Sequence, residues 1–230
     1  MLIVDLSQPV HTGMQVYPGD PEVTLTTVAT VVEDGYQVAS LHAGSHTGTH
    51  LDAPLHSIPG GRAVDAIDLS RLVGPARIVR CTGRAPRETI GWSSVAEQLE
   101  DLDGVAMVLF RTDWSEHFGS QRYLEHPVLA AEVARRLLAA GITVVGVDTL
   151  NPDATLDNGD DLPFHTVFLG ADGVIVENLA NLAQVTWDRP LVSVLPLALA
   201  GTDGAPIRAV AMQPDATDRD GRPEVPGQYG

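Results

Sequence analysis

The segment from His46 to His56 constrains the fold of this chain more than any other feature. It reads His-Thr-Gly-Thr-His-Leu-Asp-Ala-Pro-Leu-His, and its potential ligand residues all stand at even positions. In an extended chain, residues of one parity project from one face. A helix is excluded, because His50 and Asp52 would point about 200° apart at 3.6 residues per turn. The spacing therefore predicts a strand that presents these side chains together.

Compact residues within this segment shape the expected site. Gly48 and Pro54 share the parity of the histidines, which leaves room for an ion and a substrate. Pro54 should also end regular strand pairing, because proline has no backbone N–H to donate. We therefore expect His56 on a turn beside the site rather than within the strand.

The residue types in this segment favour metal binding. Two imidazoles and a carboxylate, from His46, His50 and Asp52, suit zinc, and manganese or iron nearly as well. Three protein ligands leave a coordination position open, as hydrolytic metals require. Histidine-rich loops are often plain polar surface, but three histidines and an aspartate in one short window favour a metal site. We expect His56 beside the ion as an acid/base.

Glu177 follows the apolar run Val174–Val176. A carboxylate at the end of a buried strand is costly without a partner, so a metal ion or a basic group is expected there. The sequence contains no G-x-S-x-G elbow, H-E-x-x-H motif or P-loop, which leaves a serine hydrolase, a zincin or a nucleotide enzyme unsupported.

Apolar, β-branched runs recur along the rest of the chain. Runs typical of strands are found at 2–6, 23–32, 36–41, 76–80, 105–110 and 142–147. A Glu-Asp-Gly turn at 33–35 predicts a hairpin between the second and third runs. Helices are expected at 94–100, opened by a capping box of Ser94 and Glu97, and at 127–140, with Pro127 in the first turn and Gly141 as the stop.

This order of strands and helices predicts a single α/β domain, with a mixed sheet covered by helices and a β-hairpin-rich N-terminal part. The domain should span 1–213. Residues 214–230 are rich in Asp, Gly and Pro and are expected to form a flexible tail or an arm that packs on a neighbouring subunit. The acidic run at 157–161 is expected to be a solvated loop or a lid.

Composition limits the partners and the compartment. The chain has 14 basic and 30 acidic residues and a net charge of −16, which disfavours nucleic acid and membranes as partners. A single cysteine, Cys81, excludes an intrachain disulfide and a thiolate zinc cluster. Because its start is not signal-like and no stretch is long enough to span a bilayer, we expect a cytoplasmic protein that acts on a small molecule.

The segment His46–His56 resembles the HTGTHxDAPxH signature of the cyclase-like metal-dependent hydrolases, which include bacterial kynurenine formamidases (arylformamidases) and isatin hydrolases. Other stretches resemble the same family as far as about Ala209: Asp5–Pro9, Tyr17–Asp20, Val147–Thr149, His165 and Glu177–Leu179. The resemblance implies a swivelling β/β/α fold, a homodimer or higher homo-oligomer, and hydrolysis of an amide or cyclic amide in a small aryl substrate such as N-formylkynurenine.

The resemblance also implies roles for individual residues. Five are implied as ligands of one or two divalent ions: His46, His50, Asp52, His165 and Glu177. His46, His50 and Asp52 would hold one ion. Asp52 would also bind a second ion, together with His165 and Glu177. Zinc is the expected metal and manganese the alternative. His56 would transfer protons. Tyr17 stands where kynurenine formamidases carry a tryptophan against the substrate, and is the expected substrate-binding residue.

Two other functions stay open at this point. One is a metal-dependent lyase or dehydratase, in which the ion stabilises an enolate and His56 moves a carbon-bound proton. The other is a catalytically silent metal-binding or interaction protein.

Overall fold

The computed structural model describes residues 1–155 and 161–213. Their largest feature is a nine-stranded mixed sheet in the order β1-β13-β11-β5-β7-β9-β10-β4-β12. Its strands are β1 (Ile3–Asp5), β4 (His50–Asp52), β5 (Val73–Arg80), β7 (Met107–Arg111), β9 (Val144–Val147), β10 (Val174–Glu177), β11 (Leu191–Ser193), β12 (Gly204–Pro206) and β13 (Val210–Met212). The predicted α/β fold with a mixed sheet is confirmed. The expected tail at 214–230 and residues 157–160 of the acidic run lie outside the described residues.

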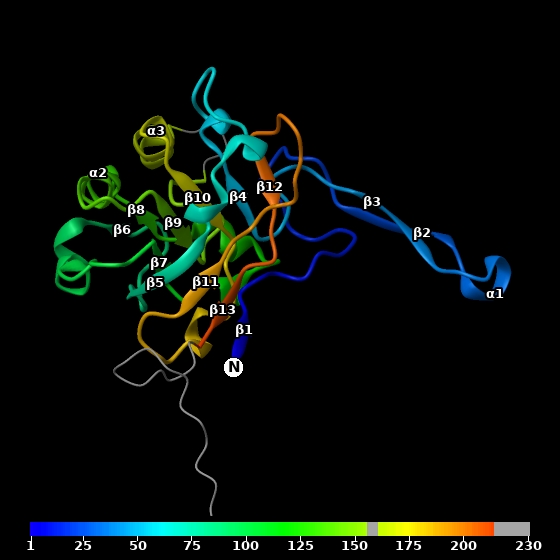
Figure 1. Cartoon of the computed structure of the whole chain (residues 1–230), viewed down its shortest axis with the longest axis horizontal. Helices are drawn as coiled ribbons and strands as arrows, with labels where there is room; N and C mark the ends of the chain where they lie inside the picture. The colour runs from blue at the N-terminus through cyan, green and yellow to red at the C-terminus, as the bar shows by residue number, and fades with distance from the viewer. Residues whose placement is uncertain (156–160, 214–230) are drawn as a thin grey trace, which may run out of the picture.

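The centre of the sheet is parallel and buried. β5, β7, β9 and β10 pair in parallel, and every residue of β9 and β10 is buried, which accounts for their continuous apolar sequences. The helices α2 (Ala131–Ala139) and α3 (Pro163–Gly170) lie together on one side of these strands (Figure 1). Phe164 and Leu137 pack there with Val145, while Leu109 and Val176 face a second core on the other side.

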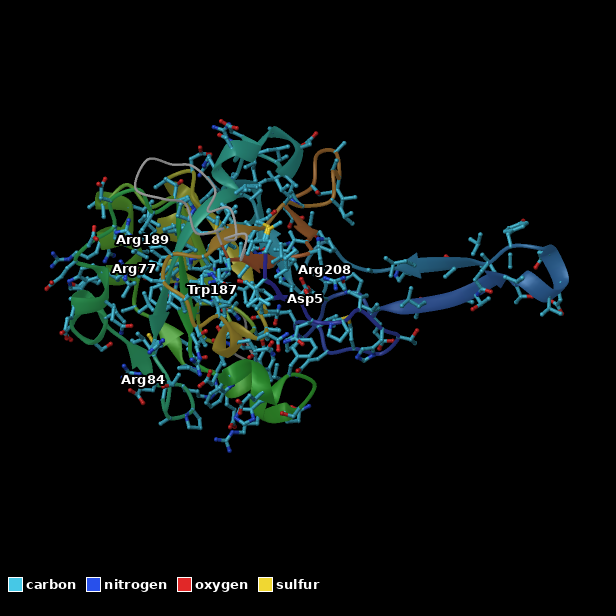
Figure 2. The ribbon with its side chains drawn as sticks, turned by 60° about the horizontal axis from the view of Figure 1, so that its bottom comes forward. Asp5, Arg77, Arg84, Trp187, Arg189 and Arg208 are labelled. Atoms are coloured by element: carbon cyan, nitrogen blue, oxygen red, sulfur yellow. The ribbon has the colours of Figure 1, made fainter. Side chains whose placement is uncertain are left out.

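The C-terminal strands bring distant residues to β4. β12 pairs antiparallel with β4, and Gly204 lies opposite Asp52. The chain then continues into β13, which pairs with both β1 and β11. Arg208, between β12 and β13, holds both carboxylate oxygens of Asp5 at 2.7 and 2.8 Å (Figure 2). Residues 204–212 thus connect β12, at one end of the sheet, with β13, which lies next to β1 at the other end.

A long hairpin extends away from this body. It consists of β2 (Thr24–Ala29), α1 (Val31–Asp34) and β3 (Val38–His42), and Figure 1 shows it projecting well beyond the other elements. The predicted hairpin is confirmed, but its connection is a helical turn, not a tight Asp-Gly turn. Thr30 caps that turn at its start, and Gly35 ends it in the left-handed conformation (φ 79°).

Two helix predictions need correction. The second long helix begins at Ala131 instead of Pro127, because Val128–Leu129 form a short parallel strand, β8, with β6 (Thr89–Ile90). The region 94–100 forms 3-10 turns, and Ser94 donates to the carbonyl of Gly91 rather than forming a capping box. Gly141 follows α2 in the left-handed conformation, as predicted. Across residues 1–155 and 161–213, no helix is long and apolar enough to cross a membrane.

Candidate metal centre

Strand β4 carries the first half of the site. It lies between β10 and β12, and all three of its residues are buried. His50 and Asp52 share one face of the strand, while Leu51 between them packs into the hydrophobic core. The antiparallel register places Glu177 of β10 directly opposite His50. Two neighbouring strands therefore present an imidazole and two carboxylates at one place.

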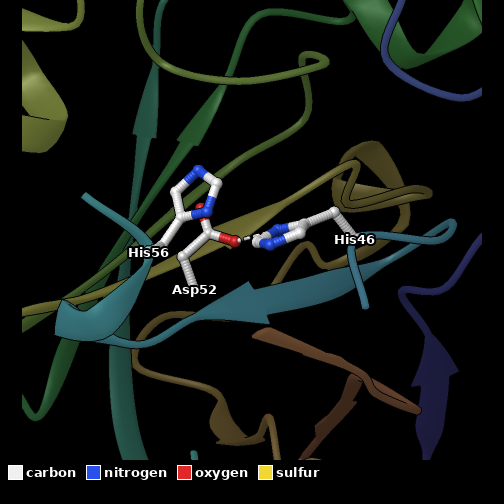
Figure 3. Close-up of side chains that lie close together, drawn as sticks. All are labelled: His46, Asp52 and His56. Atoms are coloured by element: carbon white, nitrogen blue, oxygen red, sulfur yellow. Dashed lines mark hydrogen bonds and ion pairs between the residues drawn. The ribbon is translucent and has the colours of Figure 1, made fainter. Parts of the chain in front are cut away.

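His46 reaches this place from outside the strand. It lies in a turn before β4, and Gly48, in the left-handed conformation (φ 61°), separates it from the extended residues. The prediction of one strand running from position 46 is therefore wrong, because the glycine redirects the chain. Nδ1 of His46 nevertheless lies 2.7 Å from Oδ1 of Asp52 (Figure 3).

His165 comes from α3, a helix that the sequence patterns did not indicate. Its side chain is buried, and its Nδ1 lies 2.7 Å from the carboxylate of Asp153, which also accepts the backbone N–H of His165. This partner holds the ring so that Nε2 faces Asp52 at 3.5 Å and Glu177 at 3.2 Å. Metal-binding histidines usually have such a partner on their outer nitrogen.

The two oxygens of Asp52 face different histidines. Oδ1 lies near His46 and 3.3 Å from Nε2 of His50, whereas Oδ2 faces His165. Nδ1 of His50 donates to the carbonyl of Gly48 at 2.9 Å, so Nε2 is the nitrogen available to an ion. With Glu177 opposite His50, all five residues predicted as ligands converge, and Asp52 lies between two groups of them.

The chemistry of this cluster fits a divalent metal ion. Three of its buried polar atoms lack a hydrogen-bond partner within the described part of the chain: Nε2 of His50, Oδ2 of Asp52 and Oε1 of Glu177. Leaving a buried polar group unsatisfied costs about 1–3 kcal/mol, and more if it is charged. Imidazole nitrogen and carboxylate oxygen are the donors that zinc and similar ions take in proteins.

The carboxylates also make the cluster strongly attractive to positive charge. Burial alone would lower the pKa of His46, but Asp52 and Asp203 raise it to about 11. Burial likewise opposes protonation of His50, whose pKa Asp52 and Glu177 nevertheless raise to about 9. A bound cation would take the place of protons that these carboxylates otherwise hold on the imidazoles.

His56 lies beside the cluster on a 3-10 turn that begins at Pro54, where the sequence predicted a turn. Its side chain is 27% exposed, and its Nδ1 lies 3.2 Å from Oδ2 of Asp203. Its ring centroid is 4.2 Å from that of His46 (Figure 3). His56 is therefore next to the predicted ligands and accessible to a substrate.

A pocket of about 200 Å³ opens onto these side chains. Leu150 and Leu162 contribute apolar surface, and Asn151 and Asn178 contribute polar groups. Tyr17, the predicted substrate-binding residue, also lines the pocket, and its buried hydroxyl has no hydrogen-bond partner among residues 1–155 and 161–213. The pocket therefore offers one aromatic face and several donors next to the cluster.

Asp203 and Asp153 are two site residues that were not predicted from the sequence. Asp203 bonds to both His46 and His56, and Asp153 orients His165. An Asp-Gly step at 203–204 reads only as a turn signal, so the sequence alone offered no indication of this role.

A second hollow, lined by Arg77, Arg189 and Trp187, is a weaker candidate site (Figure 2). Arg189 donates to the carboxylate of Asp101 at 2.6 Å, and Arg77 lies 3.6 Å from Asp188. These acidic partners neutralise the two arginines, so the hollow does not present a bare anion site.

Known proteins match this chain over most of its length. Residues 4–154 match the Cyclase family model (Putative cyclase). A kynurenine formamidase of Salinibacter ruber is 36% identical over 214 residues, covering 91% of this chain and 97% of the relative. A kynurenine formamidase of Bacillus cereus is 35% identical over 212 residues, covering 90% and 95%.

Solved structures share the fold. A crystal structure of an isatin hydrolase bound to the product analogue thioisatinate matches with a TM-score of 0.80 at 24% identity, covering 93% of this chain and 92% of that one. A structure described as a potential metal-dependent hydrolase with cyclase activity matches with a TM-score of 0.74 at 30% identity, covering 91% and 96%.

Proposed function

Because this chain belongs to the Cyclase family, we propose that it is a divalent-metal-dependent hydrolase that cleaves an amide bond in a small aryl substrate. The amide group is acyclic in a formamide such as N-formylkynurenine and part of a ring in isatin. The observation that carries the proposal is the convergence of buried imidazoles and carboxylates around Asp52, next to a pocket. The similarity to kynurenine formamidases in sequence and to an isatin hydrolase in structure supports an aryl amide as the substrate class.

We assign the ligands as the sequence predicted. His46, His50 and Asp52 would hold one ion, and Asp52, His165 and Glu177 a second. Zinc suits this nitrogen and oxygen donor set best, and manganese is the alternative. When bound, a divalent ion supplies Lewis-acid chemistry: it polarises a carbonyl and lowers the pKa of water.

His56 is the residue that moves protons. Since its Nδ1 faces Asp203, Nε2 is the atom left to act on a ligand in the pocket. His56 accepts the proton of the attacking water and returns it to the leaving nitrogen as the carbon–nitrogen bond breaks. Tyr17 lies along the pocket wall, where its ring can pack against an aryl group.

A screen of substrates and metals tests the proposal. Metal-depleted protein is repleted with Zn²⁺ or Mn²⁺, one at a time, and assayed with N-formylkynurenine, formanilides, isatin and small lactams. Hydrolysis of at least one aryl amide, dependent on the added metal, is expected. Inactivity on every compound with both metals would favour the catalytically silent alternative.

Labelled water separates hydrolysis from the lyase or dehydratase alternative. In H₂¹⁸O, hydrolysis places the label in the released acid, whereas elimination leaves the product unlabelled. A metal-dependent product without label would overturn the assignment as a hydrolase.

We further propose that the protein acts as a homodimer in the cytoplasm, without nucleic acid or membrane partners. The exposed hairpin supports a second copy as the partner. Of the exposed large apolar side chains, seven lie on the hairpin: Leu25, Val28, Val31, Val32, Tyr36, Val38 and Leu41. An isolated two-stranded hairpin is marginally stable in water, so such a surface needs a cover.

A groove at the root of the hairpin offers the complementary surface. It is lined by Leu41 of the hairpin and by Leu195, Leu197 and Ile207 of the body. Hairpin and groove belong to one region of the molecule, so two copies related by a twofold axis can each place a hairpin on the other.

A further inference from the structure

His46 differs from the other predicted ligands because no regular element holds it. Its turn precedes β4, and Gly48 follows it in a left-handed conformation. The other two ligand histidines are fixed on a strand and on a helix. The position of the His46 ring must therefore depend on contacts made by the ring itself.

Gly204 provides one such contact. A Cβ atom at this residue would lie 2.6 Å from Cε1 of His46 and 3.0 Å from both ring nitrogens. Gly204 is not in the left-handed region, so its backbone does not require glycine. The absence of a side chain at 204 is instead explained by the imidazole that lies against the backbone of β12.

Asp203 provides the other contact. Its Oδ2 accepts from Nε2 of His46 at 2.9 Å, and Ser45 donates to its Oδ1 at 3.0 Å. The carbonyl of Asp203 accepts the backbone N–H of Ala53 at 2.8 Å, which ties this residue to the end of β4. Asp203 is thus held in place by hydrogen bonds to both its backbone and its side chain.

We propose that Asp203 and Gly204 are positioning residues that seat His46 for metal binding, an inference that rests on the proposed function. With its Nε2–H donated to Asp203, His46 has Nδ1, the nitrogen that faces Asp52, as the atom it can offer to an ion in exchange for a proton. Gly204 leaves the space in which the ring can take this orientation. Loss of such outer partners lowers metal affinity by about 10- to 100-fold in comparable sites.

Asp203 also joins the metal ligand to the proton-transfer residue. The same Oδ2 atom lies 3.2 Å from Nδ1 of His56. One carboxylate therefore orients both rings, and its removal should affect turnover as well as metal affinity. Substrate binding should change less, because Asp203 does not line the pocket.

The test compares Asp203→Asn and Gly204→Ala with the wild type and with Asp65→Asn. Asp65 is exposed and accepts the backbone N–H of Gly201, which lies in the loop just before Asp203. Its variant therefore controls for disturbance of that loop and for the loss of one negative charge. Metal-free proteins are titrated with Zn²⁺ and with Mn²⁺ in competition with a chromophoric chelator. Circular dichroism reports folding, and kcat and KM are measured on the repleted enzymes.

Both site variants are expected to raise the metal Kd about 10- to 100-fold, while Asp65→Asn matches the wild type. Asp203→Asn should also lower kcat more than it changes KM. A folded Asp203→Asn protein with wild-type metal Kd and kcat would overturn the inference, even if Gly204→Ala failed to fold. A wild-type chain that binds neither metal would instead overturn the proposed function itself.

Discussion

His50 on β4 lies directly opposite Glu177 on β10, with Nε2 of the histidine 3.4 Å from Oε2 of the glutamate. Antiparallel pairing sets this relationship, because a shift of one residue would move either side chain to the opposite face of the sheet. The sheet on which the fold depends therefore also aligns the donor atoms of the site. Core substitutions that shift β4 or β10 should therefore lower metal affinity even when no predicted metal ligand is itself replaced.

Replacement of His56 should separate metal binding from catalysis. In His56→Ala, metal content is expected to stay at the wild-type level, because the buried ligands around Asp52 remain. The rate constant kcat should fall by about 10²- to 10⁴-fold, the usual contribution of a general acid/base. Metal analysis and steady-state kinetics on the same preparation check both points. A variant with undiminished turnover would remove His56 from the mechanism.

Replacement of Tyr17 should act on substrate binding. Tyr17→Phe keeps the ring and removes the hydroxyl, whereas Tyr17→Ala removes both. We expect Tyr17→Ala to raise KM more than Tyr17→Phe, with metal content unchanged, because the Tyr17 ring lines the pocket and Tyr17 is not one of the predicted ligands. If Tyr17→Ala has the KM of the wild type for every active substrate, the residue does not contact the substrate.

The hairpin should determine the oligomeric state. Val31 and Val32 are 63% and 95% exposed near its tip, so Val31→Asp with Val32→Asp should leave the fold of a single chain intact. Light scattering coupled to size-exclusion chromatography is expected to give a dimer for the wild type and a monomer for this variant. Leu69→Asp is the matched control, since Leu69 is 56% exposed outside the hairpin and outside the groove at its root. A dimeric double variant, or a monomeric wild type, would contradict the proposed interface.

Cys81 should be unreactive in the folded protein. It is buried, and burial raises the pKa of its thiol to about 11. Because the thiolate is the reactive form, a thiol reagent at pH 7 to 8 should label the native chain very slowly and the denatured chain fully. Fast labelling of the native protein would show that Cys81 is accessible.

The convergence of residues 46, 50 and 52 on a candidate metal site could be predicted from sequence largely because their residue types and spacing limit the alternatives. The segment 46–56 combined ligand residues with a proline that ends the strand, and both features have direct structural consequences. The buried strands were also predictable, since continuous β-branched runs such as 142–147 suit the centre of a parallel sheet. The predicted ligand role of His165 came from the family resemblance alone, whereas Glu177 was also indicated by its position after the buried apolar run 174–176.

Other features depend on contacts between distant segments. Asp203 meets His46 only because β12 pairs with β4, and no local pattern records that pairing. The predicted start of α2 was wrong. Pro127 would suit the first turn of a helix, but Val128–Leu129 pair with a distant segment as a strand, so the helix begins later. His46 was assigned to a strand because the left-handed conformation of Gly48 was not anticipated.

The most direct test of the central claim is the metal content of the wild type and of Asp52→Asn. Both proteins are metal-depleted, equilibrated with Zn²⁺ or Mn²⁺, dialysed and analysed by elemental mass spectrometry, with Asp188→Asn, which changes an exposed carboxylate, as the control. We predict one or two ions per chain in the wild type and the control, and none in folded Asp52→Asn, because Asp52 lies between both groups of ligands. Retention of the wild-type metal content by Asp52→Asn would contradict the account.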